Sequence, residues 1–113
     1  MDYQNEENVI HEKVTPGFER RIAYLEDLMV VVCNFPNGPM ERPDPPHSHP
    51  HEQITYDAEG ELLFFKEGKE YHHLKGDLII VPSSVSHCIQ TLTPFVKLAD
   101  SFYPVREEFL KQE

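Results

Sequence analysis

The sequence is poor in the residues that mark several protein classes. It has no tryptophan, only two cysteines, and no apolar run near the roughly 20 residues that span a membrane. Two cysteines are too few for a disulfide scaffold, and both Cys33 and Cys88 lie in apolar, strand-like runs. We therefore expect buried free thiols, with a disulfide as the alternative.

Positive charge is also scarce. Ten Lys and Arg stand against 20 Asp and Glu, which gives a net charge of −10. This charge repels phosphate backbones and anionic membranes, so we expect no nucleic-acid or membrane partner. The N-terminal segment lacks the basic flank and apolar core of a secretory signal, which favours a cytoplasmic protein. If the ligand is an anion, its attraction must come from a metal or from a few local arginines.

Helical periodicity is the third scarce feature. Short runs rich in β-branched and aromatic residues recur between Gly, Pro and Asp, which predicts an all-β, small antiparallel barrel or sandwich. At 113 residues we expect a single domain, with a core of roughly 18–103. Strands are expected over 20–35, hinged near Glu26 and Asp27, and over 78–82, 88–92 and 96–103. Residues 51–65 and 70–74 are expected to form hairpins, and Pro104 to open a short C-terminal helical turn.

Three histidines occupy five positions in the stretch PPHSHPHEQ, residues 45–53. Alternate residues of a strand share a face, so His47, His49 and Gln53 can point into the same interior if the strand is regular. His51 has the same parity and would need a local bend to turn away. Far along the chain, GDLIIVPSSVSH supplies a turn glycine, then a proline, and then His87.

These two segments resemble the two motifs of the cupin superfamily, a fold described as a jelly roll. The resemblance implies one divalent metal held by His47, His49, Gln53 and His87, and it places Gly60 at the family's glycine after the first motif. Three positions depart from the pattern and affect turns more than ligands: Glu41, Ser84 and Thr91.

A closer likeness covers nearly the whole chain and resembles the pectin-degradation cupins of the KdgF family, which linearise 4,5-unsaturated uronates. The family's Asp-x-Phe-x-x-x-Arg pattern corresponds to Asp100, Phe102 and Arg106. The resemblance implies that Asp100 transfers a proton, Arg106 anchors the substrate carboxylate, and Phe102 forms an apolar wall. Gln53 would also face the substrate. Asp57 and Ala58 replace larger apolar residues of the family.

Several points remain open at the level of sequence. Imidazole-rich sites accept Ni, Zn, Fe, Mn and Co, so the sequence does not identify the metal. A homodimer and a small anionic sugar substrate are expected. The alternatives are a non-catalytic metallocupin that binds a small anionic sugar or acid, an Fe(II) cupin dioxygenase, and a barrel with a polar rim and no metal. Asp100 and Arg106 can also be a structural ion pair that holds the C-terminal segment.

The other polar residues receive ordinary assignments. His51 is expected at the rim. His72 and His73 are adjacent, so at most one faces inward, and both are expected at the surface. Tyr56 and Gln90 are considered as cavity-lining groups. Of Arg20 and Arg21, one is expected at the rim and one at the surface, and His11 is expected to be solvated.

Overall fold

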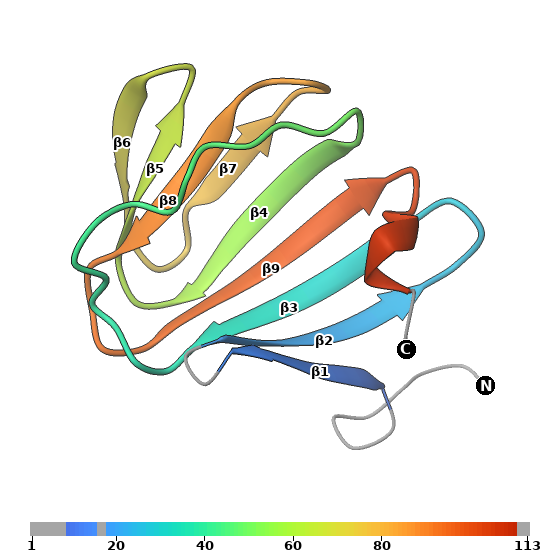
Figure 1. Ribbon diagram of the computed structural model, residues 1–113, viewed down its shortest axis with the longest axis horizontal. Helices are drawn as coiled ribbons and strands as arrows, with labels where there is room; N and C mark the ends of the chain where they lie inside the picture. Colours follow the sequence, from blue (N-terminus) through green and yellow to red (C-terminus); the bar gives the residue numbers. More distant parts are fainter. Residues whose placement is uncertain (1–8, 16–17, 111–113) are drawn as a thin grey trace.

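The structure is a computed structural model that describes residues 9–15 and 18–110. These residues form nine strands, all paired antiparallel, and one 3-10 turn (Figure 1). The strands are β1 (Ile10–Thr15), β2 (Phe18–Tyr24), β3 (Met29–Phe35), β4 (Glu52–Glu59), β5 (Leu62–Lys66), β6 (Lys69–His73), β7 (Leu78–Val81), β8 (His87–Thr91) and β9 (Val96–Tyr103), and the turn is η1 (Glu107–Phe109). This is the all-β fold that the sequence predicts.

The strands divide into two sheets. One has six strands in the order β1-β2-β3-β9-β4-β7, and the other has three in the order β6-β5-β8. The expected pair of strands around Glu26 and Asp27 is confirmed, because β2 and β3 pair directly across that turn. The 3-10 turn η1 follows Pro104, as expected, and lies near the end of β9 (Figure 1). No helix within the described ranges is long and apolar enough to cross a membrane.

The hairpin predicted over residues 51–65 is wrong. β4 pairs with β7 and β9, whereas β5 pairs with β6 and β8, so the chain passes from one sheet to the other between β4 and β5. Gly60 makes this corner with φ +84, and a Cβ there would lie 2.3 Å from the Phe95 carbonyl oxygen. Only glycine fits that position without strain. The β5–β6 hairpin is confirmed.

The sequence did not predict β1, which lies before residue 18. Its residues IHEKVT are mostly charged or polar and show no strict apolar alternation, so the usual strand signal is weak. It is held at the sheet edge by pairing with β2, where Glu12 lies opposite Arg20 and forms an ion pair with it. Cross-strand charge pairs of this kind stabilise an edge strand that buries little apolar surface.

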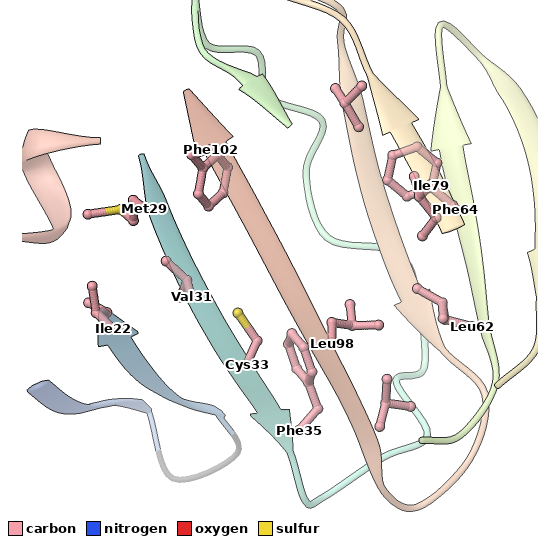
Figure 2. Close-up of a cluster of buried hydrophobic side chains, with 12 residues drawn as sticks. Ile22, Met29, Val31, Cys33, Phe35, Leu62, Phe64, Ile79, Leu98 and Phe102 are labelled. Carbon is pink, nitrogen blue, oxygen red and sulfur yellow. The ribbon is translucent and has the colours of Figure 1, made fainter. Parts of the chain in front are cut away.

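Apolar side chains from both sheets form the core (Figure 2). The buried residues that pack together are Ile22, Met29, Val31, Cys33, Phe35, Leu62, Phe64, Ile79, Val81, Val96, Leu98 and Phe102. Burial of this apolar surface stabilises the contact between the sheets. Cys33 and Cys88 are both buried and unpaired, which confirms the expectation of free thiols.

The strand β4 has an inverted pattern of polarity. Its buried residues are polar, namely Gln53, Thr55 and Asp57, whereas Ile54 and Tyr56 are exposed on the outer face of the sheet. Tyr56 is 44% exposed, so the suggestion that it lines the cavity is wrong. The reason is the period of two along a strand, which places Tyr56 on the face opposite Gln53.

Candidate metal centre and cavity

A cavity of about 460 Å³ lies in the interior. Both sheets and the C-terminal turn contribute to its wall. The residues that bear on its chemistry are Arg20, Cys33, His47, Gln53, Thr55, His87, Asp100, Phe102, Arg106 and Phe109. The cavity therefore contains histidine, carboxyl and guanidinium groups together.

Three histidines form a cluster at this cavity. His47 and His49 lie in the segment before β4, and His87 begins β8. The backbones of His47 and His87 exchange two hydrogen bonds, of 3.0 and 2.9 Å, which bring the two distant segments together. One ligand nitrogen from each of the three rings lies within 4.8 Å of the others. The cluster can hold a metal ion.

The strand is not regular through these histidines, so the condition for one shared face is not met. β4 begins only at Glu52, and His47 makes an isolated bridge to His87 instead of entering a ladder. Pro50 lacks the N–H that a continuous strand needs, so the chain bends before β4. Because of this bend, His51 lies half-buried at a separate hollow beside Pro104 rather than in the cluster, which fits its expected rim position.

Backbone carbonyls orient the three rings. His49 Nδ1 donates to the His51 carbonyl at 3.0 Å, and His87 Nδ1 donates to the Val85 carbonyl at 2.9 Å. A ring nitrogen of His47 is likewise bonded to the Pro45 carbonyl. A neutral imidazole that donates from one nitrogen keeps a lone pair on the other. Metal-binding histidines are fixed in this way in many proteins.

The rings also favour the neutral form. Burial is the main cause that lowers the pKa of His47, His49 and His87, and the positive charge of Arg106 acts in the same direction. A metal ligand must be unprotonated, so this environment suits coordination.

Gln53 brings an oxygen to the same place. Its side chain is buried, and Oε1 lies 3.0 Å from His49 Nε2. His49 carries its proton on Nδ1, so Nε2 and the amide oxygen are two acceptors that face each other. A cation between or beside two such lone pairs stabilises them, and imidazole with a carbonyl-type oxygen suits Zn, Fe, Ni and related ions. The residues present therefore fit a divalent metal. Gln53 as its fourth ligand stays a prediction.

Asp100 lies one strand away from Gln53. It is directly opposite Thr55 in the β4–β9 ladder, and its Oδ1 accepts a 2.6 Å hydrogen bond from the Thr55 hydroxyl. Its Oδ2 accepts a 3.6 Å bond from Cys33 Sγ. Burial raises the pKa of the Asp100 carboxyl, while these hydrogen bonds and Arg106 oppose the increase. A carboxyl in such a site can both accept and return a proton.

Arg106 and Phe102 form the neighbouring wall. The Arg106 guanidinium lies 5.1 Å above the Phe102 ring centre and 4.2 Å from that of Phe109. Its Nη2 forms a 3.1 Å ion pair with Glu108, and its Nε is buried with no hydrogen-bond partner among the described residues. The alternative of a direct Asp100–Arg106 ion pair finds no support in the described contacts, because the ion pair of Arg106 is with Glu108.

Arg20 is a cavity residue whose importance the sequence understated. It lines the cavity, its guanidinium lies 4.1 Å from the Phe109 ring centre, and Glu12 holds it by an ion pair. Arg21 instead forms a 3.2 Å ion pair with Glu19. The parity of Arg20 with buried Ile22 was the available signal.

Two other expectations require correction. His73 was expected at the surface, but its side chain is 16% exposed and its ring meets Phe64 edge-on at 6.1 Å, because β6 turns it towards the sheet interior. Gln90 was considered as a lining group, but it is not part of the cavity wall. Its side-chain amide instead donates to the Met40 carbonyl at 3.1 Å. His72 is exposed and forms an ion pair with Glu61, as a surface residue would.

Comparisons with known proteins agree with this geometry. Residues 32–96 match the Cupin domain family. The chain is 32% identical to the pectin degradation protein KdgF of Dickeya dadantii (strain 3937), over 88% of this chain and 89% of that protein.

Two solved structures are similar over nearly the full length. The structure of KdgF from Halomonas sp. has a TM-score of 0.82 at 30% identity, covering 93% of this chain and 94% of the other. An RmlC-like cupin from Shewanella frigidimarina NCIMB 400 has a TM-score of 0.83 at 29% identity, covering 96% of both chains. With its jelly-roll sheets and its histidine cluster, this chain belongs to the cupin family and is similar within it to the KdgF proteins.

Proposed function

We propose that the protein linearises 4,5-unsaturated uronates, small anionic sugars, to 5-keto-4-deoxyuronates. One observation carries the proposal: Asp100 and Arg106 line the same cavity as the histidine cluster, in a chain 32% identical to a KdgF protein. A proton-transfer group, a cation for a carboxylate and a candidate metal centre are the three elements that this reaction uses.

The local charge suits an anionic substrate. The whole chain carries −10, so its overall field repels anions. Within the cavity, however, burial favours the neutral form of the histidines, and Arg20 and Arg106 lie in the same wall as Asp44 and Asp100, whose carboxyl pKa values burial raises. Neutral ligands would leave the double charge of a bound metal uncompensated, which makes a local positive site.

The reaction is an isomerisation that balances without a co-reactant. The hydroxyl on C1 loses its proton, the C1–O5 bond breaks, and C1 becomes an aldehyde. The electron pair moves to O5, and C4 then gains a proton as C5 becomes a ketone. We assign both proton transfers to Asp100, which accepts the hydroxyl proton and returns it to C4.

Arg106 and Phe102 would hold the substrate. The buried Nε of Arg106 is free to donate, and a guanidinium can bind a carboxylate through two parallel hydrogen bonds. Phe102, at 2% exposure, would form the apolar wall that excludes water beside the ring.

His47, His49, His87 and Gln53 would hold the divalent metal. When bound, it supplies Lewis-acid stabilisation of the negative charge that develops on the ring oxygen beside the carboxylate. The donor set does not choose among Ni, Zn, Fe, Mn and Co.

The test is turnover of a purified unsaturated monouronate. Loss of the conjugated chromophore should be faster with metal-loaded protein than with protein stripped by a chelator, and the product should be the open-chain ketone by NMR. Oxygen uptake during the reaction would instead indicate a dioxygenase. Saturable binding of the uronate without any product would reduce the protein to a sugar-binding metallocupin.

A further inference from the structure

A buried threonine joins the candidate metal centre to Asp100. Thr55 is 2% exposed and lies between Gln53, two residues earlier on β4, and Asp100, its direct cross-strand neighbour on β9. The Gln53 amide nitrogen donates to Thr55 Oγ1 at 2.8 Å, and Thr55 Oγ1 donates to Asp100 Oδ1 at 2.6 Å. The two groups that the proposed reaction needs therefore share one hydroxyl.

The single proton of the Thr55 hydroxyl fixes which group donates and which accepts in this series of hydrogen bonds. A threonine hydroxyl can donate only one hydrogen bond. Since it donates to Asp100, it must accept from Gln53, so the amide nitrogen of Gln53 faces Thr55 and its oxygen faces His49 Nε2 at 3.0 Å. A reversed amide would place N–H groups at the histidine cluster, where no metal could be bound by them.

The other oxygen of Asp100 is also held. Cys33, on β3, donates its thiol to Asp100 Oδ2 at 3.6 Å, and burial raises the pKa of this thiol so that it remains the protonated donor. Thr55 and Cys33 thus restrain the carboxyl from two strands. The Thr55 bond is the shorter and stronger of the two, because a thiol is a weak donor.

We propose that Thr55 is a positioning residue, which turns the Gln53 oxygen towards the histidine nitrogens and holds the Asp100 carboxyl at the cavity. The part that concerns Asp100 in catalysis rests on the proposed function. The part that concerns Gln53 does not, since it predicts metal affinity alone.

The test compares three variants. Thr55→Val keeps the shape and removes the hydroxyl, Thr55→Ser keeps the hydroxyl, and Thr91→Val is the matched control. Thr91 is also fully buried, but its hydroxyl accepts a bond from the Met40 amide, outside this chain of bonds. Losing a partner of a metal ligand typically weakens metal affinity by about 10- to 100-fold.

The first readout is binding of Co²⁺ alone, by competition with a chromophoric chelator and by the visible spectrum of the bound ion. Thr55→Val should raise the dissociation constant about tenfold and change the spectrum, while Thr55→Ser and Thr91→Val stay within about twofold. The second readout is steady-state turnover, in which Thr55→Val should lower kcat about tenfold or more with little change in KM. Unchanged Co²⁺ affinity and spectrum in Thr55→Val would overturn the proposal, as would an equal loss in Thr91→Val.

A measurement without any variant covers the case in which Thr55→Val does not fold. In the unaltered protein, the side-chain amide protons of Gln53 should exchange slowly with water and show a nuclear Overhauser contact to Thr55. Rapid exchange with no such contact would contradict the proposal. If Co²⁺ binding responds as expected but the unaltered protein turns over no uronate, the proposed function fails and the role of Thr55 at the metal centre stands.

Discussion

The two faces of β4 differ in a way that reverses the usual rule. A sheet that faces water on one side normally buries its apolar residues and exposes its polar ones. Here Gln53, Thr55 and Asp57 are buried, while Ile54 and Tyr56 are 51% and 44% exposed. Burying polar groups costs free energy unless they are hydrogen-bonded. The proposed function accounts for Gln53 and Thr55 on the inward face, whereas Asp57 and the apolar outward face require explanations of their own.

The inward face is not uniform either. Gln53 donates to Thr55 and Thr55 donates to Asp100, whereas both carboxyl oxygens of Asp57 are buried with no side-chain hydrogen bond among the described residues. The cavity wall contains Gln53 and Thr55 but not Asp57. The satisfied polar residues lie at the candidate site, and the unsatisfied one lies beyond it. Buried polar residues do not by themselves indicate a functional site, but buried polar residues joined by hydrogen bonds do.

The largest effect is expected at the histidine cluster. Replacing His49 or His87 by alanine should abolish stoichiometric metal binding, because each ring supplies one of the three clustered nitrogens. Metal content after dialysis checks this, with His72→Ala as the control, since His72 is an exposed histidine paired with Glu61. A variant that still holds one metal per chain would remove its histidine from the site.

The substitution Asp100→Asn should have the next largest effect. The amide keeps the shape of the carboxyl but cannot accept the hydroxyl proton, so kcat should fall roughly a hundredfold or more. The melting temperature should change little, and circular dichroism with heating checks that point. An early-melting variant with normal turnover would make Asp100 a structural residue.

Asp57 should reduce stability at neutral pH. Burial raises its pKa from 3.8 to about 6, and the charges of Asp77, Glu59 and Glu61 add to the increase. The native state therefore binds this proton more tightly than the unfolded chain, so its favourable contribution is complete below pH 3.8 and is lost as the pH rises through about 6.

Replacing Asp57 by leucine should remove that loss. We expect about 2 kcal/mol of added stability at pH 8, because a shift of roughly two pKa units exceeds the cost of fitting a larger side chain. Urea unfolding at pH 5 and pH 8 measures it, with Glu52→Gln as the exposed control on the same strand. If the variant gains nothing at pH 8, Asp57 has a partner that the structure does not contain.

The outward face gives the smallest effect on turnover. Ile54 and Tyr56 on β4 lie opposite Ile80 and Leu78 on β7, and all four side chains are exposed on the outer face of the sheet. We propose that a second copy of this chain covers these four residues by packing the same outer face of its sheet against them. Sedimentation velocity should then show a dimer that Ile80→Lys converts to a monomer, while Leu25→Lys does not. A monomeric unaltered protein would contradict this.

Sequence reasoning predicted the elements that local patterns determine. Strands such as 96–103 follow from β-branched and aromatic runs, and the residues around His47 and His87 follow from motif spacing. Sequence reasoning failed where the structure depends on contacts between residues that are far apart in the sequence. The passage between sheets at Gly60 depends on the Phe95 carbonyl, and the burial of His73 depends on Phe64.

Thr55 shows the same limit at the site. A threonine in a strand is common and carries no functional signal by itself. Its parity with Gln53 favours an inward side chain, but only the register of β4 with β9 puts it opposite Asp100. The contact between Cys33 and Asp100 likewise depends on a register, that of β3 with β9, which places Cys33 opposite Leu98.

The most direct test is to add metal back to stripped protein while measuring both bound metal and turnover of an unsaturated monouronate. A cavity that joins the histidine cluster to Asp100 predicts that turnover rises in proportion to bound metal and reaches its plateau at one metal per chain. Turnover that is independent of metal, or full occupancy without any turnover, would contradict the account.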